Sequence, residues 1–181
     1  MSLSLQVDEF LACCHQSSQQ AFAAFSKLLV SLKSPETRKK TRQFLTSLHQ
    51  AWIHKANQQE YHFSFITQSV KTYNADRREL LLLLFPSILA PEEWSFTFYE
   101  GLLRYPTSEF YSHNVVESGC GSGWITLALA LYSLPKIIYG VDLNPKAIAC
   151  SQINLYLNAL DAEGEPILDS EQLTLLDRVK F

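Results

Sequence analysis

Apolar and polar residues alternate along this chain with two different periods. Up to about residue 57, apolar positions recur every three or four residues, which is the spacing of one helix face. One clear stripe contains Phe44, Leu45 and Leu48, and it follows a helix-start pattern at residues 34–36. The pattern predicts a helical N-terminal subdomain over residues 1–57 whose stripes pack against one another.

The period changes to two at Glu60. Aromatic residues alternate with polar ones over residues 61–65, which predicts a strand. A turn is indicated at Asn74–Asp76, and the leucine-rich run Leu80–Phe85 predicts a returning strand that is buried on at least one face. Residues 58–106 are therefore expected to form a β-hairpin and a connecting aromatic segment, with a helix from Glu93 to Arg104.

A glycine-rich stretch follows a short apolar run. Val115 and Val116 lead into Glu117, three alternating glycines come next, and an apolar helical run spans residues 124–132. This order predicts a buried strand, a tight turn and a helix. Glycines allow positive φ angles and a close approach of the backbone to a ligand, so the stretch predicts a cradle for a nucleotide-like cofactor.

The spacing of the glycines and a later acidic residue indicate which class of cofactor the loop would bind. A dinucleotide-binding loop has a third glycine where this chain has Trp124, so G-x-G-x-G fits that class poorly. Residues 137–142 predict a second strand ending in Asp142, roughly 20 residues beyond the glycines, where a ribose-binding carboxylate is expected. Asn144 and Pro145 then begin a helix.

The last residues carry weaker signals. Asn154 and Asn158 are four apart and share one face of the helix predicted over residues 145–160, where surface caps are their simplest role. Residues 161–170 read as a polar loop. Residues 178–181 look like the opening of a third strand, after which the sequence stops.

Composition limits the classes of function. The 181 residues include 47% hydrophobic residues and carry a formal net charge of -3, so no broad basic surface for nucleic acid exists. No apolar run is long enough to span a bilayer, and no signal peptide is visible. None of the four cysteines forms a C-x-x-C pair, which favours a reducing, cytoplasmic setting. Cys120 reads as a small filler within the loop.

The glycine loop with its preceding acid resembles that of the class I S-adenosylmethionine (SAM) methyltransferases. Five longer stretches are similar to the methionine S-methyltransferase family, and the likeness runs from about residue 85 to the end. Those stretches are Pro91–Leu102, Glu117–Ile125, Tyr139–Pro145, Ile153–Asp161 and Thr174–Val179. The resemblance implies an α/β fold: a partial Rossmann-like class I methyltransferase fold, first strands only, preceded by the helical subdomain and the hairpin. Residues 107–181 would be the N-terminal half of the SAM-binding domain, truncated at strand three.

The resemblance also implies an activity and a cofactor. The enzyme would move a methyl group from SAM to the thioether of free methionine and yield S-methylmethionine. A thioether has no proton to lose, so no catalytic acid or base is assigned, and no metal is expected. The implied SAM-binding residues are Glu117, Gly119, Cys120, Gly121, Gly123, Asp142, Leu143 and Asn144. The aromatic segment offers a substrate-binding group consisting of Trp94, Phe98, Tyr99 and Glu100.

Two other functions are also compatible with the sequence. One is an amine or amide methyltransferase that acts on protein glutamine or nucleic acid, and the other is a non-catalytic binding module with a SAM-type fold. We also expect the chain to be a fragment of a longer protein, inactive alone. The partners expected are a small-molecule substrate, with no nucleic acid and no membrane. An incomplete sheet would favour self-association.

Overall fold

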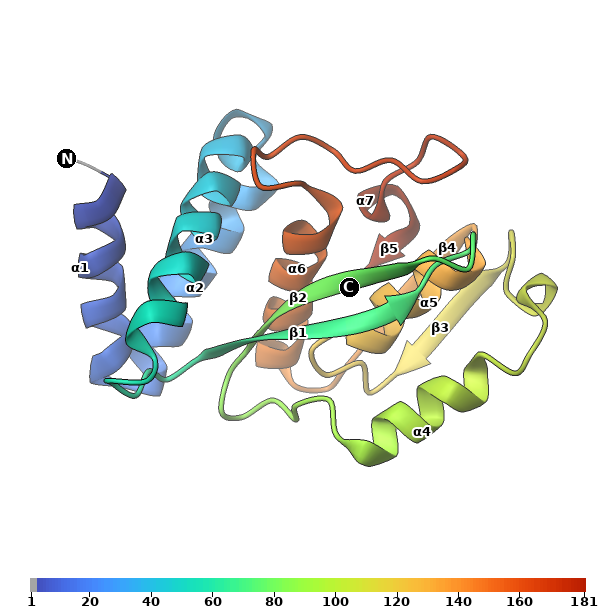
Figure 1. The fold of residues 1–181 in the computed structure, drawn as a ribbon, viewed down its shortest axis with the longest axis horizontal. Helices are drawn as coiled ribbons and strands as arrows, with labels where there is room; N and C mark the ends of the chain where they lie inside the picture. The colour runs from blue at the N-terminus through green and yellow to red at the C-terminus, as the bar shows by residue number, and fades with distance from the viewer. Residues whose placement is uncertain (1–2) are drawn as a thin grey trace.

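A computed structural model describes residues 3–181 and shows a mixed α/β chain with two small sheets (Figure 1). The helices are α1 (Leu3–Gln16), α2 (Ser18–Lys33), α3 (Pro35–Lys55), α4 (Glu93–Leu102), α5 (Trp124–Ser133), α6 (Pro145–Ala159) and α7 (Leu175–Arg178), with a 3-10 turn at Thr107–Glu109. The strands are β1 (Ser64–Lys71), β2 (Arg77–Leu84), β3 (Asn114–Ser118), β4 (Ile137–Val141) and β5 (Val179–Lys180).

The predicted N-terminal helices are confirmed as α1, α2 and α3. The hydroxyl group of Ser17 accepts a hydrogen bond from the backbone N–H of Gln20 and caps α2, while Pro35 occupies the first turn of α3. The apolar stripes face inward. The ring of Phe10 packs edge-on against the rings of Phe25 and Phe44, with ring centroids 5.0 and 5.4 Å apart. These helices lie at one end of the molecule, beside α6 (Figure 1).

The predicted hairpin is confirmed as the antiparallel pair β1–β2, with Ala75 at positive φ in its turn. Its first strand begins at Ser64 and runs on to Lys71, later than the strand predicted from Tyr61. Both of its faces are buried. Leu83 and Phe85 belong to a core shared with α1, α2, α3 and α6, whereas Leu80 and Leu82 belong to a second core built around α5. The hairpin therefore joins the helical start of the chain to its second half.

A parallel sheet in the order β3-β4-β5 forms the second half, and the predicted third strand is confirmed as β5. Val115, Ile138 and Val179 are aligned across the sheet, and Ile138 and Val179 are buried in the α5 core. On the opposite face Val116 pairs with Tyr139, and both side chains are exposed, at 66% and 41%. Within residues 3–181, one face of this sheet is thus covered and the other bears exposed apolar residues.

Candidate functional site

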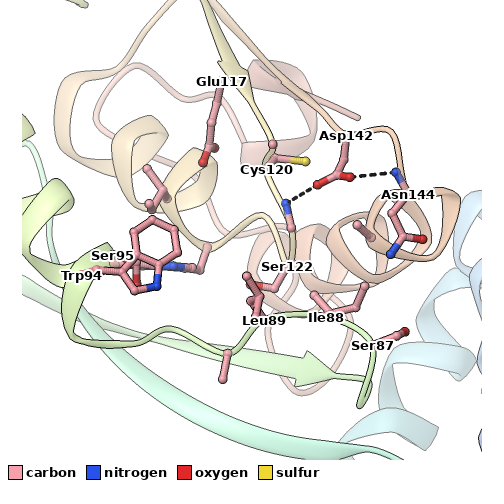
Figure 2. A pocket seen from close by; sticks show the side chains of 16 residues that line it. Ser87, Ile88, Leu89, Trp94, Ser95, Glu117, Cys120, Ser122, Asp142 and Asn144 are labelled. Atoms are coloured by element: carbon pink, nitrogen blue, oxygen red, sulfur yellow. Dashed lines mark hydrogen bonds between the residues drawn. The ribbon is translucent and has the colours of Figure 1, made fainter.

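A cavity of about 240 Å³ lies between the glycine loop and the segment that follows β2 (Figure 2). Glu117, Asp142 and the glycine loop form one side, and residues 87–90 form the facing side. The site is therefore built from two parts of the chain that are far apart in sequence. Its lining consists of Ser87, Ile88, Leu89, Ala90, Trp94, Ser95, Glu117, Gly119, Cys120, Gly121, Ser122, Trp124, Ile125, Asp142, Asn144 and Ala147.

The first two loop glycines leave room over the cavity. Gly119 and Gly121 have φ angles of +76° and +55°, a region that L side chains rarely adopt. The N–H groups of Gly119 and Cys120 donate to the carbonyl of Val141, at 2.7 and 3.1 Å, which fixes the loop over the end of β4. A Cβ atom built on Gly119 or Gly121 would meet no atom of the described chain within 4 Å. The loop thus presents bare backbone to the cavity.

Gly123 has a different role. Its φ is +78°, and a Cβ there would lie 2.6 Å from the Cβ of Ser151 and 2.7 Å from the ring of Phe181. Gly123 does not line the cavity. The sequence suggested close approach to a ligand at all three glycines, whereas the structure makes Gly123 a packing position at the start of α5.

Asp142 ties the loop to the following helix. One carboxylate oxygen accepts the N–H of Gly121 at 2.9 Å, and the other accepts the N–H of Asn144 at 2.8 Å (Figure 2). The side chain of Asn144 in turn caps α6 by accepting the N–H of Lys146. Because an ionised carboxylate has about four acceptor positions, roughly two remain for a ligand.

Glu117 is a carboxyl group in an unfavourable environment. Burial raises its pKa to about 7, and the charge of Asp142 acts in the same direction. Hydrogen bonds with Thr126 oppose this shift and lower the pKa. A positively charged ligand group beside Glu117 would favour its ionised form. Glu117 lines the cavity and has no ion-pair partner within residues 3–181, so this end of the cavity suits an amine or another cation.

Cys120 lines the cavity as a neutral thiol. Burial raises its pKa to about 11, so it does not act as a thiolate nucleophile at neutral pH. This agrees with its interpretation as a small filler. Leu143, by contrast, is fully exposed and is absent from the cavity lining.

The four residues suggested to bind the methyl acceptor do not lie together in the structure. Trp94 lines the cavity and is 60% exposed. Tyr99 is buried against Trp124, and its hydroxyl accepts the N–H of Lys71 in the hairpin. Phe98 and Glu100 are exposed and lie outside the lining. Only Trp94 of the four is placed next to the glycine loop.

Two residues in or beside the site were not assigned to it from the sequence. Ser122 is 2% exposed and lines the cavity, and its hydroxyl is buried with no hydrogen-bond partner in the described chain. Asn154 is buried and hydrogen-bonds both to the loop and to β2, so its interpretation as a surface cap was wrong. A polar residue in an otherwise apolar helix face was the available signal for Asn154.

The structure also bears on metal binding, on membrane-spanning helices and on the cysteines. No group of three or more potential metal ligands lies together in residues 3–181. None of the helices described in that range is long and apolar enough to cross a membrane. Cys13, Cys14, Cys120 and Cys150 are all free thiols.

Comparisons with known proteins find similarity to methyltransferases. The family model of the ribosomal protein L11 methyltransferase (PrmA) matches residues 102–179. The chain is 47% identical to a methionine S-methyltransferase of Arabidopsis thaliana, 44% to one of Wollastonia biflora and 42% to one of Zea mays. Each match covers 97% of this chain but 17% of the relative. Along almost its whole length, the chain is therefore a homologue of one segment of the methionine S-methyltransferases.

Proposed function

We propose that the chain is the SAM-binding part of a methyltransferase that methylates the thioether sulfur of free methionine to give S-methylmethionine. The observation that carries the proposal is the bare glycine loop, tied to Asp142 beside a cavity. Its relatives at 41–47% identity are named methionine S-methyltransferases, which supports the choice of acceptor. The activity of the whole enzyme is part of the proposal, because the chain spans 17% of those relatives.

The residues present fit SAM. Space over Gly119 and Gly121 admits a ribose and an amino-acid tail, and Asp142 has acceptor positions left for the ribose hydroxyls. Glu117 suits the α-amino group of the SAM tail, and the hydroxyl of Ser122 needs a partner. The cavity of about 240 Å³ lies below the usual range of roughly 300–1,000 Å³ for small-molecule sites, so we regard it as one part of the site.

Catalysis in this proposal rests on position and charge. SAM supplies a methyl group on a sulfonium sulfur, and a thioether attacks it without losing a proton. No residue of the chain has to act as a base, and the protein contributes orientation and the exclusion of water. The indole of Trp94 offers a π-face to a sulfonium cation at the cavity edge.

The architecture and setting are proposed with the same function. We assign β3, β4 and β5 to a Rossmann-like methyltransferase sheet, and we keep residues 1–57, 58–106 and 107–181 as the proposed domain units. The four free thiols support a reducing compartment such as the cytoplasm.

Calorimetry with SAM and with S-adenosylhomocysteine tests the cofactor, and transfer of a labelled methyl group to free methionine tests the reaction. The experiments use this chain and a longer polypeptide that contains it. Asp142→Ala should weaken SAM binding by about 1.5–3 kcal/mol, because hydrogen bonds to a charged group are lost. An unchanged affinity in Asp142→Ala would remove this carboxylate from the site. Absence of SAM binding in both polypeptides would overturn the proposal.

A protein acceptor is the second candidate, since the matching family model is that of a ribosomal protein methyltransferase. The two candidates share the SAM site and differ in the acceptor. Labelled methyl groups in S-methylmethionine would support the first, and labelled methyl groups in protein would support the second.

A further inference from the structure

Helix α6 pairs with the free edge of the hairpin through two asparagine side chains. The carboxamide of Asn154 accepts the N–H of Leu83 at 2.7 Å and donates to the Leu83 carbonyl at 3.0 Å. The carboxamide of Asn158 does the same at Leu81, at 3.0 and 2.8 Å. The two side chains thus take the place of a neighbouring strand along β2.

Such pairing is needed because the edge of β2 is not solvated here. Leu83 is fully buried, and an unpaired backbone N–H or carbonyl at such a place costs about 1–3 kcal/mol. Asn154 and Asn158 are themselves 0% and 4% exposed, so their amides are removed from water too. Each asparagine therefore contributes to the stability of the fold in the same way.

Only Asn154 also reaches the glycine loop. Its amide nitrogen donates a second hydrogen bond to the Ser122 carbonyl at 2.9 Å, whereas that of Asn158 donates to the carbonyl of Asn154, within α6. One side chain therefore contacts both β2 and the loop.

This link joins the two sides of the cavity. β2 ends at Leu84, and residues 87–90, a few positions later, form the side that faces the loop (Figure 2). We propose that Asn154 is a positioning residue that sets the separation of these two sides and so the affinity for SAM. This inference rests on the proposed function.

The hydrogen bonding of Ser122 supports the same inference. Asn154 holds its carbonyl, while its hydroxyl is buried at the cavity without a partner in the described chain. A fixed main chain at this position keeps this unpaired hydroxyl in one place beside the cavity. Without the Asn154 bond, the carbonyl would need another donor and the loop could rotate.

Asn158 provides a matched control, because it makes the same contacts to β2 and none to the loop. Asn154→Ser and Asn158→Ser should lower the stability to urea by similar amounts. Only Asn154→Ser should weaken the binding of S-adenosylhomocysteine in calorimetry, by about tenfold, the effect of one to two hydrogen bonds. Equal affinities in the two folded variants would overturn the inference.

Hydrogen exchange gives a second readout that does not require a bound ligand. The amides of residues 119–123 should exchange faster in Asn154→Ser than in Asn158→Ser. The amide of Leu83 should exchange faster in Asn154→Ser, and the amide of Leu81 should exchange faster in Asn158→Ser. If Asn154→Ser does not fold, Asn154→Gln and Asn158→Gln replace the pair, because they keep a carboxamide and displace it by one methylene. A parent chain that binds neither SAM nor S-adenosylhomocysteine would overturn the proposed function, and exchange at the loop would then decide the role of Asn154.

Discussion

At the scale of single residues, Glu117 gives the folded chain a dependence on pH. Its pKa is raised from an ordinary value near 4.5 to about 7, mainly by burial. The folded state therefore holds this proton more tightly than the unfolded state, and stability falls as the pH rises from about 4.5 through about 7. A ligand that supplies a positive charge would relieve this cost.

Glu117→Gln should remove that dependence. Relative to the parent, the variant should gain roughly 2–3 kcal/mol of unfolding free energy between pH 4.5 and pH 8, as measured by urea denaturation. The same variant should bind SAM more weakly. Glu100→Gln, at an exposed position on α4, is the control and should follow the parent at both pH values. A parallel pH profile for Glu117→Gln would contradict the prediction.

The loop glycines should separate binding from stability. Gly121→Ala places a methyl group in open space over the cavity at a strain of about 1–2 kcal/mol, so its main effect should be weaker SAM binding. Gly123→Ala meets Ser151 and Phe181 below 3 Å and should destabilise the fold by about 2–4 kcal/mol. Urea denaturation and calorimetry on both variants check this, and a Gly121→Ala variant that binds like the parent would contradict it.

At the scale of elements, one buried arginine holds α7 and β5 to the rest of the sheet. Arg178 is 3% exposed and donates to Asp169 at 2.6 Å, to Glu171 at 2.6 Å and to the Pro135 carbonyl at 2.8 Å. Burial raises the pKa of Asp169, but the hydrogen bonds from Arg178 and the loop backbone outweigh it and lower this pKa overall. The network therefore loses stability as the pH falls through the lowered pKa of Asp169.

Arg178→Met should cost about 3 kcal/mol of unfolding free energy, because it leaves a carboxylate and a buried carbonyl without their donor. Lys39→Met removes one partner of the exposed ion pair with Glu165 and serves as the control, with no measurable loss expected. Urea denaturation of both variants at neutral pH checks the difference. Equal stabilities would show that the Arg178 network contributes little.

The elements themselves follow from local sequence, and the contacts between them do not. Residue patterns predicted α1 to α6, the hairpin and the three strands of the parallel sheet, since each depends on neighbours within a few positions. The short helix α7 was not predicted. The bonds of Asn154 join residues 71 and 32 positions apart, and no local pattern encodes them. Sequence proximity also suggested Tyr99 for the acceptor, but α4 turns this ring toward the hairpin.

At the scale of the whole molecule, one face of the parallel sheet carries exposed apolar side chains. Val116, Tyr139 and Val141 are exposed on this face, and β3 has no hydrogen-bonded neighbour on its outer edge in residues 3–181. Free strand edges and apolar patches promote association. We therefore propose that the 181-residue chain self-associates through this face.

Sedimentation over a wide range of concentration tests this expectation. The double variant Val116→Thr with Tyr139→Thr should shift the chain toward the monomer, because it reduces the apolar area of the face. Leu168→Thr changes an exposed leucine elsewhere and should leave the association unchanged. A parent chain that stays monomeric at every concentration would contradict the proposal.

The shared hairpin affects how the protein can be dissected. The match to the L11 methyltransferase family model begins at residue 102 and so omits β1 and β2. A recombinant piece trimmed to that match would expose the buried face of α6 to water and leave the amides of Asn154 and Asn158 without the strand they bind. Expression of such a minimal piece should yield insoluble or molten material, so cloning boundaries are better chosen ahead of β1.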